Sequence, residues 1–294
     1  MPSYKTLLVG IDLHEGSAGA LQSALRIGTQ SQARIHALYV IEDSIVHDLQ
    51  VGLKRMEVDL LDSLKSDARA AWKQFTQDMP EAGAVSFDVQ IAHPAVALTK
   101  EAERLQADLL VLGTEKPGRV GATVLEMACL RKSPCDVLIA RQVPPEPFKN
   151  IVACVDFSEH SRQVLERASK LAAMENAKLT ALHVFHGPWH KLHYRAPTPE
   201  ASPKFEREYV EMLNRRLSEF SKAAGDANTN VLLREHSNDG DGIIRESRRL
   251  DADLIVVGSK GRSMLADMFL GRTAERVLRE TSCSVLVIKS DGRN

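Results

Sequence analysis

The sequence predicts an α/β protein built from two tandem domains, each a five-stranded parallel sheet flanked by helices. Two observations support this prediction: the chain repeats itself, and short apolar runs alternate with longer segments of helical period. The chain has 294 residues, and at roughly 100 to 200 residues per domain this length favours two domains. A hydrophobic content of 44% and a charged content of 26% are typical of globular proteins and argue against disorder.

The internal repeat covers most of the chain. Residues 7–12 (LLVGID) align with residues 151–156 (IVACVD) at an offset of 144. Later matches pair 38–40 with 182–184, 107–113 with 252–258, and 135–139 with 283–287. Residues 143–148 (VPPEPF) contain three prolines, which prevent regular hydrogen bonding and stiffen an extended connection. We therefore expect a tandem duplication with domains over 1–142 and 149–294.

Continuous apolar runs in each repeat are typical of buried parallel strands joined by crossover helices. In the second repeat we expect strands over 150–156, 178–185, 230–235, 253–258 and 283–289. The segment 205–222 carries an apolar stripe at spacings of three and four, so it should be a helix facing the sheet. In the first repeat, 6–11 reads as a strand and Trp72 as part of an equivalent helical stripe. The expected fold is flavodoxin/Rossmann-like, with strand order 3-2-1-4-5.

Three glycines follow the fourth predicted strand of the second repeat at a fixed spacing. Gly258 can form a tight turn, Gly261 lets the backbone approach an anion, and Gly271 opens a helical stretch at 274–280. Backbone amides at a helix N-terminus lack intrahelical partners, so those of residues 271–273 can receive a phosphate. Asp156 ends the first strand, and the crevice at the switch point should lie between strands one and four. The sequence thus predicts a phosphate site flanked by Asp156 and Gly258.

This pattern resembles the universal stress protein family, whose ATP-binding members carry Gly, two residues, Gly, nine residues, Gly, and then Ser or Thr. Residues 155–161 (VDFSEHS) resemble the family's opening strand and turn, and 182–184 (LHV) resemble its second strand. Residues 270–277 (LGRTAERV) resemble its last helix. Both halves fit, so the chain is similar to the tandem, two-domain members of the family.

The resemblance implies that the second domain binds ATP or a related nucleotide, with Mg²⁺ as a candidate companion ion. Asp156 would lie near the ribose and adenine, and the backbone of Val184 would contact the adenine edge. Arg272 stands where the family has Ser or Thr, which removes a hydroxyl but adds a cation able to pair with phosphate. The implied binding residues are Asp156, Val184, Gly258, Gly261, Gly271, Arg272 and Thr273.

The first repeat departs from the glycine spacing. Gly113 is present, but Lys116 stands at the second glycine position and the third falls near Thr123, in a shorter loop. Gly118 and Gly121 do not restore the spacing. We therefore expect the first domain not to bind nucleotide in the family manner. It should serve as a structural partner, forming a pseudo-dimer within one chain through the final strands, with further homodimerisation open.

The charges of the chain nearly cancel, so the molecule has no overall electrostatic field that would attract a polyanion. Lys plus Arg (38) nearly balances Asp plus Glu (39), which argues against nucleic acid or an anionic membrane as partner. No apolar run reaches about 18 residues, and no signal-peptide pattern precedes the first strand, so we expect a cytoplasmic protein. Four cysteines without a CxxC pair favour reduced, buried thiols over disulfides or a zinc ribbon.

Two further clusters suggest metal sites only weakly. The histidines follow an HxxH pattern, but Pro188 interrupts any helix and no Cys, Asp or Glu joins the run. Residues 238–242 (NDGDG) resemble the start of a calcium loop without the remaining ligands, so we expect a turn before a helix at 243–250. The four histidines are His183, His186, His190 and His193.

The function that the sequence favours is a stress-response protein that binds ATP in its second domain and acts as a regulator or protective scaffold. An efficient enzyme is not expected, because the chain has no P-loop signature and no recognisable nucleophile and base around the glycines. One alternative is slow Mg²⁺-dependent ATP hydrolysis, with Asp156 helping to hold the ion. A third hypothesis is a ligand or protein interaction module that has lost nucleotide binding.

Overall fold

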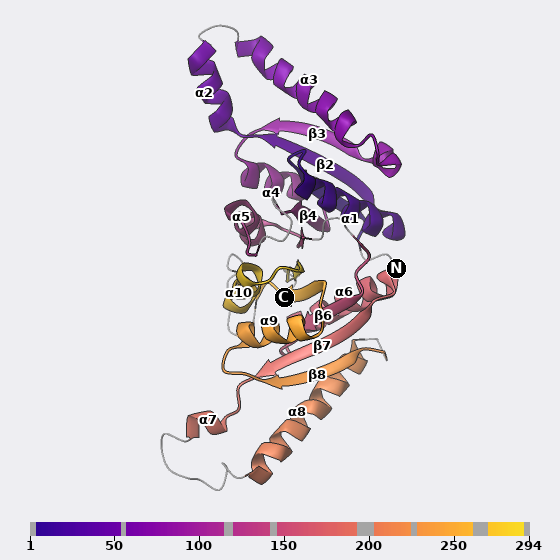
Figure 1. Ribbon diagram of the computed structural model, residues 1–294, viewed down its shortest axis with the longest axis vertical. Helices are drawn as coiled ribbons and strands as arrows, with labels where there is room; N and C mark the ends of the chain where they lie inside the picture. Colours follow the sequence, from indigo (N-terminus) through magenta and orange to yellow (C-terminus); the bar gives the residue numbers. More distant parts are fainter. Residues whose placement is uncertain are drawn as a thin grey trace. The chain divides into compact units, whose positions relative to one another are not determined.

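The structure divides into two α/β units, Met1–Glu146 and Pro147–Asn294 (Figure 1). This computed structural model describes residues 4–53, 57–114, 120–141, 146–192, 203–224, 228–260 and 270–290. Each unit contains a parallel sheet with helices on both faces. The predicted fold class is therefore confirmed in each repeat.

The first unit has its strands in the order β3-β2-β1-β4-β5, and every pair is parallel. Its elements, in chain order, are β1 (Thr6–Ile11), α1 (Glu15–Ser31), β2 (Arg34–Ile41), α2 (Asp43–Leu53), α3 (Glu57–Phe75), the 3₁₀ turn η1 (Pro80–Ala84), β3 (Ser86–Ile91), α4 (Pro94–Arg104), β4 (Leu109–Gly113), α5 (Val124–Lys132) and β5 (Asp136–Ala140).

The second unit repeats this topology, with strand order β8-β7-β6-β9-β10 and parallel pairing throughout. Its elements are β6 (Asn150–Cys154), α6 (Glu159–Glu175), β7 (Lys178–Phe185), α7 (Trp189–Leu192), α8 (Pro203–Ala223), β8 (Asn230–Glu235), α9 (Asp239–Arg249), β9 (Leu254–Gly258), α10 (Arg272–Glu280) and β10 (Ser284–Ile288). Counted along the chain, both sheets have the expected order 3-2-1-4-5.

The central strands form the core because helices cover both faces of each sheet. Nearly every residue of β4, β5, β9 and β10 is buried, as continuous apolar strands require. Right-handed crossovers place α6 and α8 on one face of the second sheet and α9 and α10 on the other. The connections from β6 and β9 leave in opposite directions, so a crevice is expected between the carboxyl ends of these strands.

Helical stripes predicted from the sequence pack as core. Trp72 of α3 is nearly buried and stacks on Phe87 of β3, with ring centroids 4.4 Å apart. On α8, Leu213 and Leu217 are buried against the sheet of the second unit. Trp72 is thus held by packing, as its position in an apolar stripe predicts.

Several predicted boundaries are wrong by one to four residues, and two of them have a clear physical cause. The strand expected over 150–156 ends at Cys154, because the chain turns after Val155. The helix expected over 243–250 begins at Asp239, because the Asn238 side chain caps it by accepting a hydrogen bond from the Asp241 amide at 3.2 Å. Residues 238–242 are therefore a helix start and not a turn before one.

Candidate functional site

Asp156 forms the turn that follows β6. Its Oδ1 accepts hydrogen bonds from the Ser158 amide, at 3.0 Å, and from the Ser158 hydroxyl. Between them Phe157 adopts a left-handed φ of 66°, and Ser158 then caps α6 by accepting from the Ser161 amide at 3.1 Å. The half-buried Asp156 carboxylate therefore sits at the carboxyl end of β6, where the crevice is expected.

The first unit contains the same turn without the glycine motif. Asp12 Oδ1 accepts from the His14 amide at 3.0 Å, and Leu13 has a φ of 64°. An aspartate at this position thus has a structural role in both repeats, whatever else it does in the second.

The first glycine of the motif allows a helix to approach the end of a strand. A Cβ on Gly258 would lie 2.7 Å and 2.8 Å from Cδ2 and Nε2 of His160, at the start of α6. A Cβ on Gly113 would overlap the carbonyl oxygen of Gly16, at the start of α1. Packing therefore requires glycine at Gly113, where a Cβ would meet backbone, and at Gly258 a side chain would have to displace the His160 ring.

His160 lies beside Gly258, at the carboxyl ends of the strands, and sequence reasoning missed it. Its Nδ1 lies 3.3 Å from Gln163 Oε1, and its Nε2 is buried without a well-formed hydrogen bond in the described part of the chain. Burial lowers the pKa of His160, while Gln163, the Ile288 carbonyl and Asp156 partly oppose this change and nearby Lys260 adds to it. One feature of the sequence could have pointed to His160: the equivalent position of the first repeat is a glycine, Gly16.

Backbone hydrogen bonds fix both ends of the glycine loop. The Ser259 amide donates to the Ile288 carbonyl, and the Gly271 amide donates to the Ser259 carbonyl, each at 2.8 Å. The prediction that the Gly271 amide is unpaired is therefore wrong. Gly261 lies outside the described residues, so its expected role stays a prediction.

Among the described residues, no side chain caps the N-terminus of α10. Gly271 is its N-cap residue, with φ −62° and ψ 145°, and has no side chain that could bond the first-turn amides. The amides of Arg272, Thr273 and Ala274 therefore have no acceptor within the helix. Arg272 is exposed and Thr273 half-buried, so this end of the helix can meet a ligand from solvent.

The equivalent helix of the first unit, α5, is closed by its own side chains. Thr123 Oγ1 accepts from the Glu126 amide at 3.1 Å, and Glu126 Oε2 accepts from the Thr123 amide at 2.8 Å. This is a capping box, and both residues are buried. A carboxylate of the chain thus occupies the end of α5 that an anion would need. The sequence contains this capping-box signature, Thr-x-x-Glu, but a comparison of glycine spacing between the two repeats does not detect it.

The backbone of Val184 faces the side of β7 where the crevice is expected. Pairing of β6 with β7 ends at Cys154 and Leu182, where the Val155 amide donates to the Leu182 carbonyl at 2.9 Å. Successive residues of a strand direct their N–H and C=O groups to opposite sides, so those of Val184 point the same way as those of Leu182. They therefore point toward the side of β7 on which β6 has already ended.

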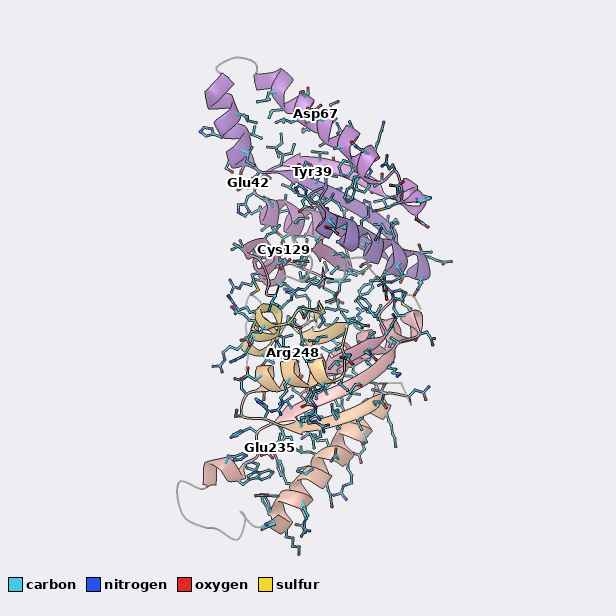
Figure 2. All side chains as sticks on the ribbon, in the orientation of Figure 1. Tyr39, Glu42, Asp67, Cys129, Glu235 and Arg248 are labelled. Carbon is cyan, nitrogen blue, oxygen red and sulfur yellow. The ribbon has the colours of Figure 1, made fainter. Side chains whose placement is uncertain are left out.

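The histidine cluster does not assemble as a metal site in the described residues. His183 Nδ1 lies 2.7 Å from the Val155 carbonyl, and His190 Nε2 lies 2.7 Å from Oε1 of Glu235, which Figure 2 labels. The rings of His186 and His190 have centroids 5.2 Å apart. The part of the chain that the structure describes contains no group of three His, Cys, Asp or Glu side chains able to hold an ion. His193 lies outside that part.

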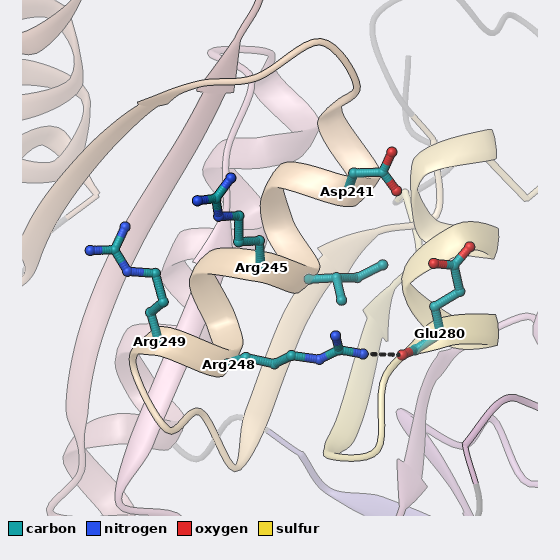
Figure 3. A pocket seen from close by; sticks show the side chains of 6 residues that line it. Asp241, Arg245, Arg248, Arg249 and Glu280 are labelled. Carbon is teal, nitrogen blue, oxygen red and sulfur yellow. Dashed lines mark hydrogen bonds between the residues drawn. The ribbon is translucent and has the colours of Figure 1, made fainter.

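A cavity of about 400 Å³ lies between α9 and α10, away from the N-terminus of α10 (Figure 3). Arg248 donates to the Glu280 carbonyl at 3.3 Å, and Arg249 pairs with Glu246 at 3.3 Å. Arg248 and Arg249 therefore already bond to groups of the second unit. We interpret the cavity as a surface groove between α9 and the end of α10. It is lined by Asp241, Ile244, Arg245, Arg248, Arg249 and Glu280.

Within the described residues, no helix combines the length and the apolar character needed to cross a membrane.

Comparison with known proteins matches the whole chain to one family. A sequence model described as the universal stress protein family matches residues 3–141 and again residues 147–289. Universal stress protein E of Photorhabdus laumondii is 27% identical over 314 residues, covering 99% of this chain and 97% of that protein. Universal stress protein E of Escherichia coli K12 is 23% identical, with 99% and 96% coverage.

Among solved structures, a universal stress protein from Archaeoglobus fulgidus superposes with a TM-score of 0.69 at 20% identity, covering 97% of this chain and 98% of that chain. At this identity the likeness shows a shared fold.

Proposed function

Because the chain belongs to the universal stress protein family, we propose that it is a stress-response protein whose second unit binds ATP or a related nucleotide. The binding site lies at the carboxyl ends of β6, β7 and β9 and the N-terminus of α10. The bound nucleotide makes the protein a regulator or scaffold and is not rapidly consumed.

The observation that carries this proposal is the difference between the two helix ends. In α5 the amides of Thr123 and Glu126 donate to the Glu126 carboxylate and the Thr123 hydroxyl, whereas α10 has Gly271 and Ala274 at the same positions and so no such side chains. An uncapped helix N-terminus attracts anions through its free amides and the positive end of the helix dipole. Lys260 and Arg272 add positive charge at this edge of the second unit. These features support the triphosphate binding at the N-terminus of α10.

The Val184 backbone supports adenine as the base. An N–H and a C=O of one residue on the same side of a strand offer a donor beside an acceptor. The Watson–Crick edge of adenine presents the complementary pair, an acceptor at N1 and a donor at N6. Asp156 follows β6 between the base end and the phosphate end, where a ribose would lie.

The proposal is tested by isothermal titration of nucleotide-stripped protein with ATP and Mg²⁺, after mass spectrometry of whatever co-purifies. We expect one site per chain in the wild type and no binding in Gly261→Val. The matched control is Gly83→Val, because a Cβ at Gly83 meets nothing within 4 Å, so binding should be unchanged. A wild-type protein that shows no heat and carries no nucleotide would contradict the proposal.

A further inference from the structure

The first-strand pairing differs between the two repeats by one residue pair. In the first unit, β1 and β2 pair as far as Ile11 and Tyr39. Since the Leu38 carbonyl faces β1, this last pair requires the Val40 amide to donate to the Ile11 carbonyl. In the second unit, β6 and β7 pair only as far as Cys154 and Leu182. The equivalent bond, from the Val184 amide to the Val155 carbonyl, is therefore missing from the ladder.

His183 provides the physical reason for this difference. Its Nδ1 lies 2.7 Å from the Val155 carbonyl oxygen, which is the acceptor that the Val184 amide would otherwise use. Because a carbonyl can only accept, Nδ1 must carry the hydrogen of this bond. Tyr39 stands at the equivalent position of the first unit, and its only side-chain donor is at the far end of the ring. A carbonyl oxygen can accept two hydrogen bonds, yet the ladder closes beside Tyr39 and stops beside His183, where the Nδ1 hydrogen takes the place of the Val184 amide.

The His183 ring is held firmly in this arrangement. The residue is buried, and its ring centroid lies 4.3 Å from that of Phe157. Phe157 is in turn in edge contact with Phe220 of α8, with centroids 5.7 Å apart and the rings nearly perpendicular. The left-handed turn after Asp156 thus brings an aromatic side chain against His183 and fixes the imidazole beside the Val155 carbonyl.

We propose that His183 is a positioning residue of the nucleotide site: its Nδ1 hydrogen occupies the Val155 carbonyl and so leaves the Val184 amide free to donate to the nucleobase. This inference rests on the proposed function for the identity of the ligand, but the release of the amide does not depend on any ligand. It makes His183 a determinant of base recognition that does not itself touch the base.

The first test follows amide hydrogen exchange at Val184 in the full chain without nucleotide. In the wild type, Val184 should exchange at least about tenfold faster than Val40, because only Val40 is bonded in a ladder. His183→Tyr, which copies the first repeat, should slow exchange at Val184 to the level of Val40. His183→Asn keeps a donor close to the backbone and should preserve fast exchange. Equal protection of Val184 and Val40 in the wild type would overturn the proposal.

The reciprocal variant, Tyr39→His, controls for general effects of substitution at this position. It should speed exchange at Val40 while leaving Val184 unchanged. Unaltered far-ultraviolet circular dichroism in all variants confirms that the units remain folded. If His183→Tyr leaves exchange at Val184 as fast as in the wild type, the histidine is not what frees the amide.

The second test separates base recognition from phosphate binding. His183→Tyr should weaken ATP binding about tenfold, the effect of one lost hydrogen bond, while binding of inorganic tripolyphosphate stays unchanged. Unchanged ATP affinity, or equal losses for both ligands, would overturn the role in base recognition. If wild-type protein binds neither ligand while the exchange pattern holds, the proposed function fails and the release of the amide by His183 stands.

Discussion

At the residue scale, the two repeats differ at a few positions that change what the backbone offers. His160 replaces Gly16 and His183 replaces Tyr39, and each places an imidazole against a strand end. Sequence reasoning placed Asp156 and Gly258 at strand ends because apolar runs mark where strands stop, whereas Val184 was implied by the family resemblance. It could not predict that His160 lies beside Gly258, because this contact between distant residues does not change the hydrophobic periodicity of the sequence.

His160 should make the protein less stable in mild acid. Burial lowers its pKa below the ordinary value of 6.5, so the unfolded chain binds a proton at a pH where the native chain does not. Stability contributed by the neutral imidazole is therefore lost as the pH falls below about 6.5. We expect urea unfolding at pH 7.5 and 5.5 to show a smaller difference in His160→Gln than in the wild type.

The control for this prediction is His47→Gln, because His47 is exposed on α2. It should leave the pH dependence unchanged. A pH dependence in His160→Gln equal to that of the wild type would show that the buried imidazole does not control it.

Cys129 of α5, labelled in Figure 2, should be chemically inert in the native protein. It is fully buried, and burial together with the Glu126 carboxylate raises the pKa of its thiol to about 12. Since the thiolate is the reactive form, iodoacetamide at pH 8 should modify Cys129 only after denaturation. Peptide mapping by mass spectrometry checks this, and native modification at the rate of a free cysteine would refute it.

At the element scale, the strands were predictable and the helix starts were not. The strands expected over 178–185 and 230–235 match β7 and β8 to the residue. β7 is a largely buried apolar run, whereas most of β8 is exposed or half-buried and only its central residues are apolar. The start of α9 was missed because glycines within 238–242 suggested a turn, although Asn238 is a favoured N-cap residue. Helix starts depend on single side-chain bonds, which periodicity does not report.

The capping box of α5 should contribute measurably to stability. Glu126→Ala removes the acceptor for the Thr123 amide and should lower the free energy of unfolding by about 1 kcal/mol. Glu126→Gln keeps an acceptor and should cost less. Chemical denaturation followed by circular dichroism measures both. If the alanine variant were as stable as the wild type, the capping box would contribute nothing to the free energy of unfolding.

At the scale of the whole molecule, the two repeats differ in hydrogen bonding at the carboxyl edge of their sheets. In the first unit the helix end carries Thr123 and Glu126, and the strand ladder runs on to Tyr39. In the second, α10 is uncapped and the ladder stops one pair earlier. Glycine spacing predicts that only the second unit binds nucleotide, and this stays a prediction. The two observed differences are hydrogen bonds that glycine spacing does not show.

The most direct test of the account transfers the cap from one unit to the other. Gly271→Thr with Ala274→Glu recreates the capping box at α10, and the backbone of Gly271, with φ −62° and ψ 145°, accepts a threonine without strain. Titration with ATP and Mg²⁺ should give one site per chain in the wild type and none in this double variant, and circular dichroism and thermal unfolding check its fold because Ala274 is buried. Wild-type affinity in the double variant, or two sites in the wild type, would contradict the account.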